Sequence, residues 1–438
     1  MGETQKKEKK KIGLTTKIFI ALLAGAVFGI ILCYAVPSGH IKDDIIVEGV
    51  LYVVGQGFIK LMKMLVVPLV FCSLVCGSMS IGDTKKLGTV GARTLIFYLA
   101  TTALAVTVAL SVGNLINPGV GLDMSTIKTN AASVETMKAT SLTDTLLNII
   151  PDNPINSLAS GEMLQIIVFA LIIGVILAKL GERAETVANF FSQFNDIMME
   201  MTMMIMALAP IGVFCLISRT FANIGFSAFV PLAKYMIGVL IALAIQCFGV
   251  YQILLKIFTG LNPLKFIKKF FPVMAFAFST ATSNATIPLS IDTLSKKVGV
   301  SKKISSFTIP LGATINMDGA AITITIMALS VANTMGVSVD VPTALMLSLM
   351  ATLGACGASG VAGGSLLLIP MACSLFGIPQ DISMQAVAVG MIIGVVQDSL
   401  ETAINSSGDV LFAATAEYRQ WQKDGREFKI GAIVNPDE

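Results

Sequence analysis

One apolar segment, residues 304–335, is interrupted near its middle by residues that strongly constrain the fold of this chain. The interruption spans 308–321 and contains a proline, two glycines, an amide and a carboxylate, namely Pro310, Gly312, Gly319, Asn316 and Asp318. Inside a lipid bilayer, each polar group without a partner costs on the order of several kcal/mol. We therefore expect a broken membrane helix whose gap is filled by a cation.

The composition is that of a protein that crosses a membrane many times. Hydrophobic residues make up 55% of the 438 positions and charged residues 13%, compared with about a quarter in soluble domains. The seven cysteines include no CxxC pair, and the only histidine, His40, lies beside Asp43 and Asp44. This pattern predicts neither a disulfide framework nor a histidine metal centre. The net charge of +3 gives no indication of nucleic-acid binding.

Apolar stretches of membrane-spanning length divide the rest of the chain. A retained first helix is expected from Leu14, because the apolar run there lacks the small-residue cleavage site of a signal peptide. Further apolar segments lie at about 46–81, 94–116, 160–180, 198–220 and 226–258, followed by interrupted ones at about 265–292, 304–335, 342–377 and 382–416.

Lysines and arginines gather in alternate loops, which indicates that these loops are cytoplasmic. The basic regions are 6–11, 85–93, 179–183, 265–269, 296–303 and 419–429. Both ends of segment 265–292 are therefore expected on the same side, whereas 342–377 lies between loops that lack lysine and arginine. Each segment is predicted to be a re-entrant hairpin, and both chain termini are predicted to be cytoplasmic.

The tips of the two predicted hairpins have unusual compositions for membrane depth. Residues 278–288 are rich in serine and threonine, and residues 354–365 are rich in glycine. Such stretches are tolerated only where protein or a water-filled cavity covers the backbone, and a pair of them indicates a transporter site at the midplane. Close helix packing through small residues is the alternative. It explains the glycines but not the hydroxyl-rich tip beside a helix that carries carboxylates.

The last apolar segment carries polar residues on one helical face. Asp398, Glu401, Thr402, Asn405 and Asp409 follow the helical period, so their side chains are expected to face the protein interior.

No lysine, arginine or histidine occurs between Ile304 and Tyr418, so the compensating positive charge is expected to arrive with a ligand. A metal ion, a proton and a substrate ammonium group all satisfy this requirement. An arginine from an earlier helix, Arg93 or Arg219, is the alternative. Amide and carboxylate oxygens are hard ligands that suit an alkali or other hard cation better than zinc or copper.

The sequence Asn316-Met317-Asp318-Gly319 and the two hairpin tips together resemble the dicarboxylate/amino acid:cation symporter family, the glutamate-transporter-like proteins. The resemblance implies an all-α polytopic membrane protein with eight transmembrane helices and two re-entrant helical hairpins. It implies a homotrimer in contact with membrane lipid, in which a transport domain moves as an elevator against a scaffold. The implied parts are a basic cytoplasmic N-terminus (1–13), scaffold helices 1–2 (14–93), transport-domain helix 3 (94–116), an extracellular loop (117–158), scaffold helices 4–5 (159–220), the rest of the transport domain (221–416) and a cytoplasmic tail (417–438).

The same resemblance implies which residues bind the ligands. Sodium ligands would be Gly312, Asn316, Asn405 and Asp409 at one site, Tyr98, Thr101, Thr102, Asn316 and Asp318 at a second, and Thr314 and Met317 with Ala355, Cys356 and Ala358 at a third. Asp398 would accept the substrate ammonium group, while Ser283 and Asn405 would bind its α-carboxylate. Further substrate contacts would be Thr282, Asn284, Ala320, Ala358, Ser359, Gly360, Val361, Ala362, Glu401 and Thr402.

Several positions depart from the members that carry acidic substrates. Those members have an arginine at the position of Glu401 and a threonine at that of Ala320. A further arginine of theirs corresponds to Ala281 or Ser399 here. Two carboxylates facing each other at low dielectric would cost on the order of several kcal/mol, so an acidic side chain is disfavoured. A substrate hydroxyl could instead donate a hydrogen bond to Glu401.

The run at 398–407, Asp-Ser-Leu-Glu-Thr-Ala-Ile-Asn-Ser-Ser, and the second hairpin tip at 355–365 most resemble the serine/threonine:sodium symporter branch. We expect sodium-coupled uptake of a small neutral amino acid, serine or threonine first, across the bacterial inner membrane and without an organic cofactor. Some members of that branch lack the aspartate at the position of Asp318, which leaves the number of coupled ions open. An acidic amino acid or C4-dicarboxylate symporter of the same fold is the first alternative, and an ion channel is the second. No nucleophile–base pair or metal triad indicates an enzyme.

Overall fold

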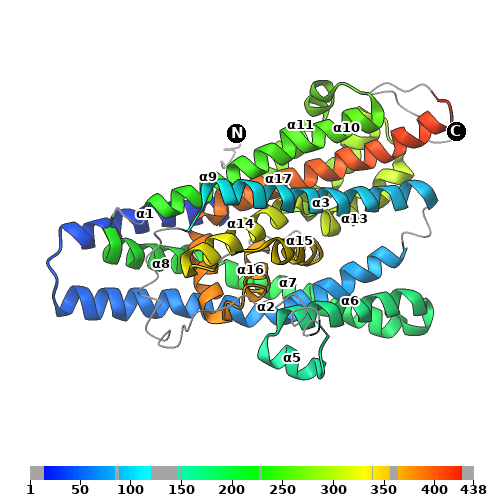
Figure 1. Cartoon of the computed structure of the whole chain (residues 1–438). Coiled ribbons are helices and arrows are strands. Elements are labelled where there is room, and N and C mark those ends of the chain that lie inside the picture. The colour runs from blue at the N-terminus through cyan, green and yellow to red at the C-terminus, as the bar shows by residue number, and fades with distance from the viewer. Residues whose placement is uncertain are drawn as a thin grey trace, which may run out of the picture. The chain divides into compact units, whose positions relative to one another are not determined.

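The computed structural model describes residues 14–83, 88–119, 147, 150–225, 229–337, 339–355 and 364–426. Every regular element in these ranges is a helix (Figure 1). The chain forms two compact units. One comprises Met1–Lys60 with Met203–Ser227, and the other comprises Leu61–Thr202 with Ala228–Glu438.

The first unit is built on the packing of two helices through small residues. Its elements are α1 (Leu14–Tyr34), the π-helical η1 (Ile41–Leu51), the start of α2 (Tyr52–Asp83) and α8 (Ala209–Ile224). A Cβ atom on Gly29 of α1 would lie 2.5 Å from the carbonyl oxygen of Ser218 in α8. Only glycine allows this approach, which is the small-residue packing typical of membrane helices.

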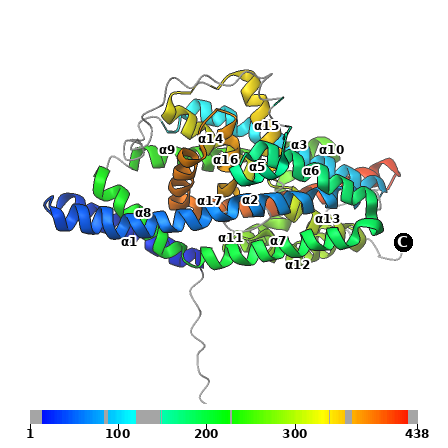
Figure 2. The ribbon, with the colours of Figure 1, turned by 90° about the horizontal axis from the view of Figure 1, so that it is seen from below.

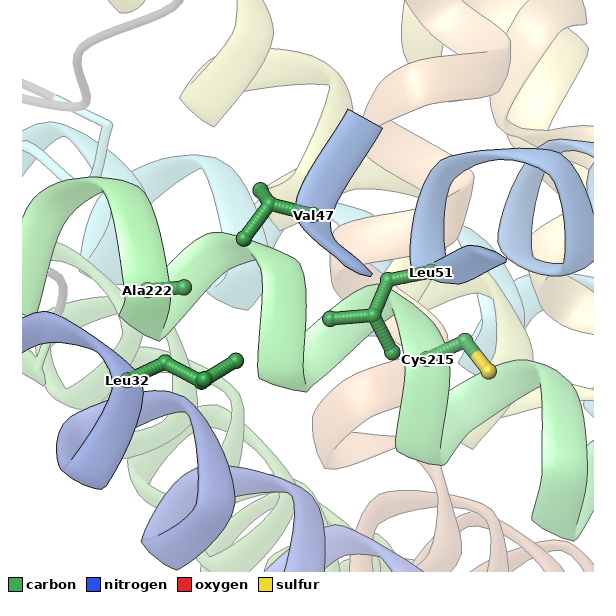
Figure 3. Packing of buried hydrophobic residues seen from close by; sticks show 5 residues of the cluster. All are labelled: Leu32, Val47, Leu51, Cys215 and Ala222. Carbon is green, nitrogen blue, oxygen red and sulfur yellow. The ribbon is translucent and has the colours of Figure 1, made fainter. Parts of the chain in front are cut away.

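A small apolar cluster completes the first unit (Figure 3). It joins α1, η1 and α8 through Leu32, Val47, Leu51, Cys215 and Ala222, all of which are buried. Apolar burial of this kind holds the π-helical segment against the two longer helices.

Two predicted segments of the chain differ from the observed helices. The segment expected at 46–81 begins earlier, because η1 already starts at Ile41. The segment expected at 198–220 is not one helix, since α7 (Glu185–Met206) ends before α8 begins at Ala209. Pro210 explains the interruption, because proline lacks the backbone N–H of a continuing helix and suits the first turn of a new one.

The second unit contains the larger parts of α2 and α7 and all of the remaining helices. They are α3 (Gly88–Ile116), α5 (Pro154–Ser160), α6 (Met163–Leu180), the 3₁₀-helical η4 (Gly181–Ala184), α9 (Phe229–Ala244), the π-helical η6 (Ile245–Val250), α10 (Tyr251–Thr259), α11 (Pro263–Thr280), α12 (Ser283–Asp292), the π-helical η7 (Thr293–Val298), α13 (Lys302–Ile315), α14 (Asp318–Met335), α15 (Val341–Ala355), the 3₁₀-helical η8 (Ser365–Leu368), α16 (Ile369–Ser374) and α17 (Gln380–Lys423). The short helix α5 lies beside α6 (Figure 2).

The first expected hairpin consists of α11 and α12, which pack against each other. The side chain of Asn262 accepts the N–H of Leu264 and so caps the start of α11, with Pro263 in the first helical turn. The helix ends at Thr280, and the next residue, Ala281, has a positive φ of 50° that reverses the chain before α12 starts at Ser283. The hydroxyl-rich tip therefore forms a tight turn between two helices.

The helix expected at 304–335 is broken at the polar residues from which the break was predicted. Helix α13 ends at Ile315 and α14 begins at Asp318, which leaves Asn316 and Met317 outside helical geometry. Helix α14 packs against both α3 and α17. Helices long and apolar enough to cross a membrane within the described residues are Val90–Ile116, Gln165–Ile205, Ala233–Thr259 and Ile304–Met335, the last of which spans this break and is the most buried.

Candidate functional site

The amide of Asn316 connects the break in the helix with α17. Its Nδ2 donates to Asp409 Oδ1 at 2.9 Å and to the carbonyl oxygen of Asn405 at 3.1 Å. Its Oδ1 is buried and has no hydrogen-bond partner among the described residues. A buried carbonyl oxygen without a donor is costly unless a ligand binds it. The same amide is hydrogen-bonded to the Asp409 carboxylate through Nδ2, so a hard cation bound at Oδ1 would have a negative charge nearby.

Asp318 begins α14 and is completely buried. Its Oδ1 accepts from Thr102 at 2.7 Å and from Thr101 at 3.5 Å, both on α3. Its Oδ2 accepts from Gln246 Nε2 and from the Tyr251 hydroxyl, each at 2.8 Å. The structure thus brings together three residues of the predicted second sodium site and adds two donors that the sequence analysis missed.

Gln246 and Tyr251 are placed by a π-helical segment, η6, in which Gln246 is the second residue and which Tyr251 follows. Such segments widen a helix locally and often occur at functional sites. Gln246 Oε1 is also buried without a partner among the described residues. A glutamine within the apolar segment 226–258 was the available signal for this residue, since an amide at membrane depth requires a partner.

Gly312, Tyr98 and Asp409 converge on the other side of the break. A Cβ atom on Gly312 would collide with Asp409 Oδ1 and would lie 2.9 Å from the Tyr98 hydroxyl. That hydroxyl donates to the carbonyl oxygens of Thr308 at 3.1 Å and Asp409 at 3.3 Å. The absence of a side chain at Gly312 therefore leaves its backbone close to the carboxylate.

The side chain of Asn405 is used within the fold. Its Oδ1 accepts the N–H of Gly319 at 2.8 Å and so caps the N-terminus of α14, while its Nδ2 donates to Met317 Sδ at 3.3 Å. The predicted sodium and substrate residue Asn405 thus also fixes the break against α17. The third predicted site contains Thr314, which is half-buried, and Met317 and Ala355, which are buried, with Ala355 at the end of α15.

Glu401 is buried and hydrogen-bonded to neutral donors. Gln397 Nε2 donates to its Oε1 at 2.8 Å, and the Thr323 hydroxyl donates to the same oxygen. The Tyr235 hydroxyl donates in turn to Gln397 Oε1 at 2.6 Å. Thr323, Gln397 and Tyr235 were not predicted. The spacing of four residues between Gln397 and Glu401 was the available signal for the first contact.

The other predicted substrate residues lie on three elements. At the first hairpin tip, Ser283 is buried, Thr282 is half-buried and Asn284 is exposed. Asp398 is half-buried on α17, where Thr402 is buried, and Ala320 is buried on α14. Residues Cys356, Ala358, Ser359, Gly360, Val361 and Ala362 lie outside the described residues.

The two arginines considered as internal counter-charges have other partners. Arg93 Nη1 donates to Gln420 at 2.9 Å. In the first unit, Arg219 pairs with Glu48 at 2.9 Å, and its guanidinium lies 4.8 Å from the centre of the Tyr52 ring. Among the described residues, no group of three or more His, Cys, Asp or Glu could hold a metal ion. The oxygen donors around the break are therefore mixed amides, hydroxyls, carbonyls and single carboxylates, which suit a weakly bound alkali ion.

Gly319 provides a test of how closely α14 and α17 must approach. A Cβ atom at this position would lie 2.7 Å from Glu401 Cα and 2.9 Å from its carbonyl oxygen, and backbone atoms cannot move aside. We predict that Gly319→Ala lowers the thermal unfolding midpoint in detergent, at an overpacking cost of about 1–3 kcal/mol.

The matched control for this change is Gly238→Ala in α9, where the nearest atoms would be ordinary contacts at 3.7 and 3.8 Å. This variant is expected to be as stable as the original protein or more stable. Equal midpoints for both variants would show that the close approach at Gly319 does not restrict the packing of the two helices.

A membrane helix broken at a buried carboxylate, with a cluster of oxygen donors around the break, defines a secondary transporter that couples its substrate to a cation. The chain belongs to the sodium:dicarboxylate symporter family, whose sequence profile matches residues 14–418. This match confirms the family expected from the sequence. It also confirms the prediction that the protein is a transporter rather than an enzyme.

Two relatives are similar over nearly their whole length. The chain is 39% identical over 417 residues to the serine/threonine transporter SstT of Bifidobacterium adolescentis. The aligned region covers 94% of this chain and 91% of the relative. It is 38% identical over 398 residues to the serine/threonine transporter SstT of Campylobacter jejuni. Here the aligned region covers 91% of this chain and 94% of the relative.

Proposed function

We propose that this protein imports serine or threonine together with sodium. The observation that carries the proposal is Glu401, a buried carboxylate that accepts hydrogen bonds from the neutral side chains of Gln397 and Thr323. A neutral hydroxyl can donate to this carboxylate, whereas a substrate carboxylate would be repelled. The names of the two relatives above support the same substrates.

The amino-acid backbone of the substrate is assigned to α17 and the first hairpin. Asp398 accepts hydrogen bonds from the ammonium group of the substrate. Ser283 and Asn405 donate hydrogen bonds to its α-carboxylate. The Asn405 amide can do so because its Nδ2 donates to the Met317 sulfur, which is a weak acceptor that a carboxylate readily replaces. The remaining predicted contacts at both hairpin tips, with Ala320 and Thr402, enclose the substrate.

Sodium is assigned to the oxygen donors around the break in the helix. The unpartnered Asn316 Oδ1 and the Asp409 carboxylate, next to Gly312 and Asn405, form one site. Asp318 with Tyr98, Thr101 and Thr102 forms a second, and the region of Thr314, Met317 and residues 355–358 forms a third. The segment from Ile304 to Tyr418 contains no lysine, arginine or histidine. Bound sodium therefore supplies the positive charge that neutralises its buried carboxylates.

The family description also names dicarboxylates, which makes an acidic substrate the second candidate. Such a substrate would require a positive group near its second carboxylate. The position that would supply it carries Glu401, so the cost is on the order of several kcal/mol. We therefore rank a dicarboxylate or acidic amino acid below serine and threonine.

We further propose an architecture that couples the transport of the two ligands. The protein acts as a homotrimer of eight transmembrane helices and two hairpins per chain in the bacterial inner membrane, with both termini in the cytoplasm. Residues 14–93 and 159–220 form the scaffold, and 94–116 with 221–416 form a transport domain that carries substrate and sodium across as an elevator. Because substrate and sodium share Asn405 and the adjoining break, each favours binding of the other.

The test of this function is uptake by purified protein in proteoliposomes. We predict that external serine accumulates against its gradient when an inward sodium gradient is imposed, and that threonine competes whereas aspartate and succinate do not. Liposomes without protein and vesicles with equal sodium on both sides are the controls. Equal accumulation with a proton gradient alone would reject sodium as the coupling ion. Flux without accumulation would instead indicate a channel.

A further inference from the structure

A chain of hydrogen bonds from three helices ends on Glu401. The Tyr235 hydroxyl on α9 donates to Gln397 Oε1 at 2.6 Å, and Gln397 Nε2 on α17 donates to Glu401 Oε1 at 2.8 Å. The Thr323 hydroxyl on α14 donates to the same carboxylate oxygen. All four side chains are buried, and the three helices contact one another (Figure 1).

This arrangement fixes the direction of the Gln397 amide. If the amide were reversed, its oxygen would face the Glu401 carboxylate, and two acceptors would then lie in contact at low dielectric. The Tyr235 hydroxyl stabilises the observed direction because it donates to the amide oxygen. Gln397 therefore presents its N–H group to Glu401 in a single orientation.

The two donors also fix the carboxylate itself. Since Gln397 and Thr323 both bind Oε1, rotation of the Glu401 carboxylate about its last side-chain bond would break two hydrogen bonds. The other oxygen, Oε2, is thereby held in one direction. Leucine and phenylalanine would fill the space of Gln397 and Tyr235 without any need for matched hydrogen bonds. The effect on Glu401 accounts for the polar pair better than packing does.

We propose that Gln397 and Tyr235 are positioning residues that give the transporter its preference for a substrate side chain with a hydroxyl group. By holding Glu401 Oε1, they present Oε2 as the acceptor for that hydroxyl. This inference rests on the proposed function, in which Glu401 receives the side chain of serine or threonine. The class of substrate selected in this way is a small neutral amino acid that carries a hydroxyl donor.

The experiment compares serine with alanine, which differ only in the hydroxyl group. In sodium-driven proteoliposome uptake, Gln397→Leu is expected to lower the ratio of serine to alanine kcat/KM about tenfold, and Tyr235→Phe about threefold. The KM for alanine and the sodium concentration at half-maximal uptake are expected to stay within about twofold, because neither residue binds the shared part of the substrate.

The matched control is Gln252→Leu, the same change at a buried glutamine whose amide donates to the Cys247 carbonyl oxygen. It is expected to leave the serine-to-alanine ratio unchanged. An unchanged ratio in Tyr235→Phe would overturn the positioning role, as would an equal loss of serine and alanine uptake in that variant. Tyr235→Phe removes one oxygen atom only, so it decides the question if Gln397→Leu does not fold. A failure of the original protein to accumulate serine with sodium would reject the proposed function instead.

Discussion

Replacement of Glu401 by arginine is expected to convert the protein from a serine transporter into an aspartate transporter. The variant loses the charge-assisted hydrogen bond to the substrate hydroxyl, worth about 1.5–3 kcal/mol, so serine kcat/KM should fall about 10- to 100-fold. The guanidinium group gains a bidentate contact with an acidic side chain, which removes the repulsion that now excludes aspartate. Competition of unlabelled serine and aspartate against each labelled amino acid, in sodium-driven uptake, measures the change.

Two variants separate the role of charge from that of shape at this position. Glu401→Gln removes the charge and keeps the volume, so serine uptake should weaken while aspartate gains nothing. Glu182→Arg makes the same charge reversal at an exposed position in η4 and should leave the substrate order unchanged. If Glu401→Arg transported serine as well as the original protein, Glu401 would not contact the substrate side chain.

The broken helix shows how much of the fold the sequence predicts. The membrane allows irregular backbone only where it has partners, so the polar residues near Asn316 marked the break that the structure shows between α13 and α14. The same reasoning predicted the turn after Thr280. It missed the start of α7 at Glu185, because the largely exposed first turns of that helix mix polar residues with apolar ones and form no continuous apolar run. It also missed the π-helical geometry of η1 and η6, which changes hydrogen bonding without changing composition.

The candidate site was predictable only in part, because its hydrogen bonds join residues far apart in the sequence. Thr101 and Thr102 were assigned through the family resemblance, and the structure adds that both lie against Asp318. Gln246 lies in a segment that was read only as apolar, and its contact with Asp318 depends on how α9 packs against α14. Periodicity predicted an inward face of α17, but all residues from Glu401 to Tyr418 are buried and Asp398 is only half-buried, so the structure does not distinguish that face by burial. Nor could periodicity show that Glu401 shares its oxygen with Thr323 on another helix.

Replacement of Asp318 by asparagine is expected to abolish sodium-coupled uptake, to below about a tenth of the original rate, because it removes the negative charge proposed to hold sodium. The change also places an amide NH₂ group, which can only donate, against side chains that themselves donate. An amide has one acceptor atom, so its NH₂ group would face either Thr102 or the pair Gln246 and Tyr251, all of which now donate to Asp318. The variant should therefore lose sodium affinity as well as transport rate.

Sodium binding can be measured apart from transport by the shift in thermal unfolding midpoint between sodium and choline buffers. A ligand that binds only the folded state stabilises it by RT ln(1 + [L]/Kd), so Asp318→Asn should lose most of the sodium-dependent shift. Asp340→Asn is the matched control, because Asp340 is exposed, accepts the N–H of Thr343 at the start of α15 and can be replaced there by another capping residue. Tyr251→Phe removes one of the four donors to Asp318 and should have an intermediate effect. If Asp318→Asn kept the full sodium shift but lost uptake, Asp318 would act in the movement of the loaded protein rather than in holding the ion, and the coupling site would have to be sought at Asn316 and Asp409.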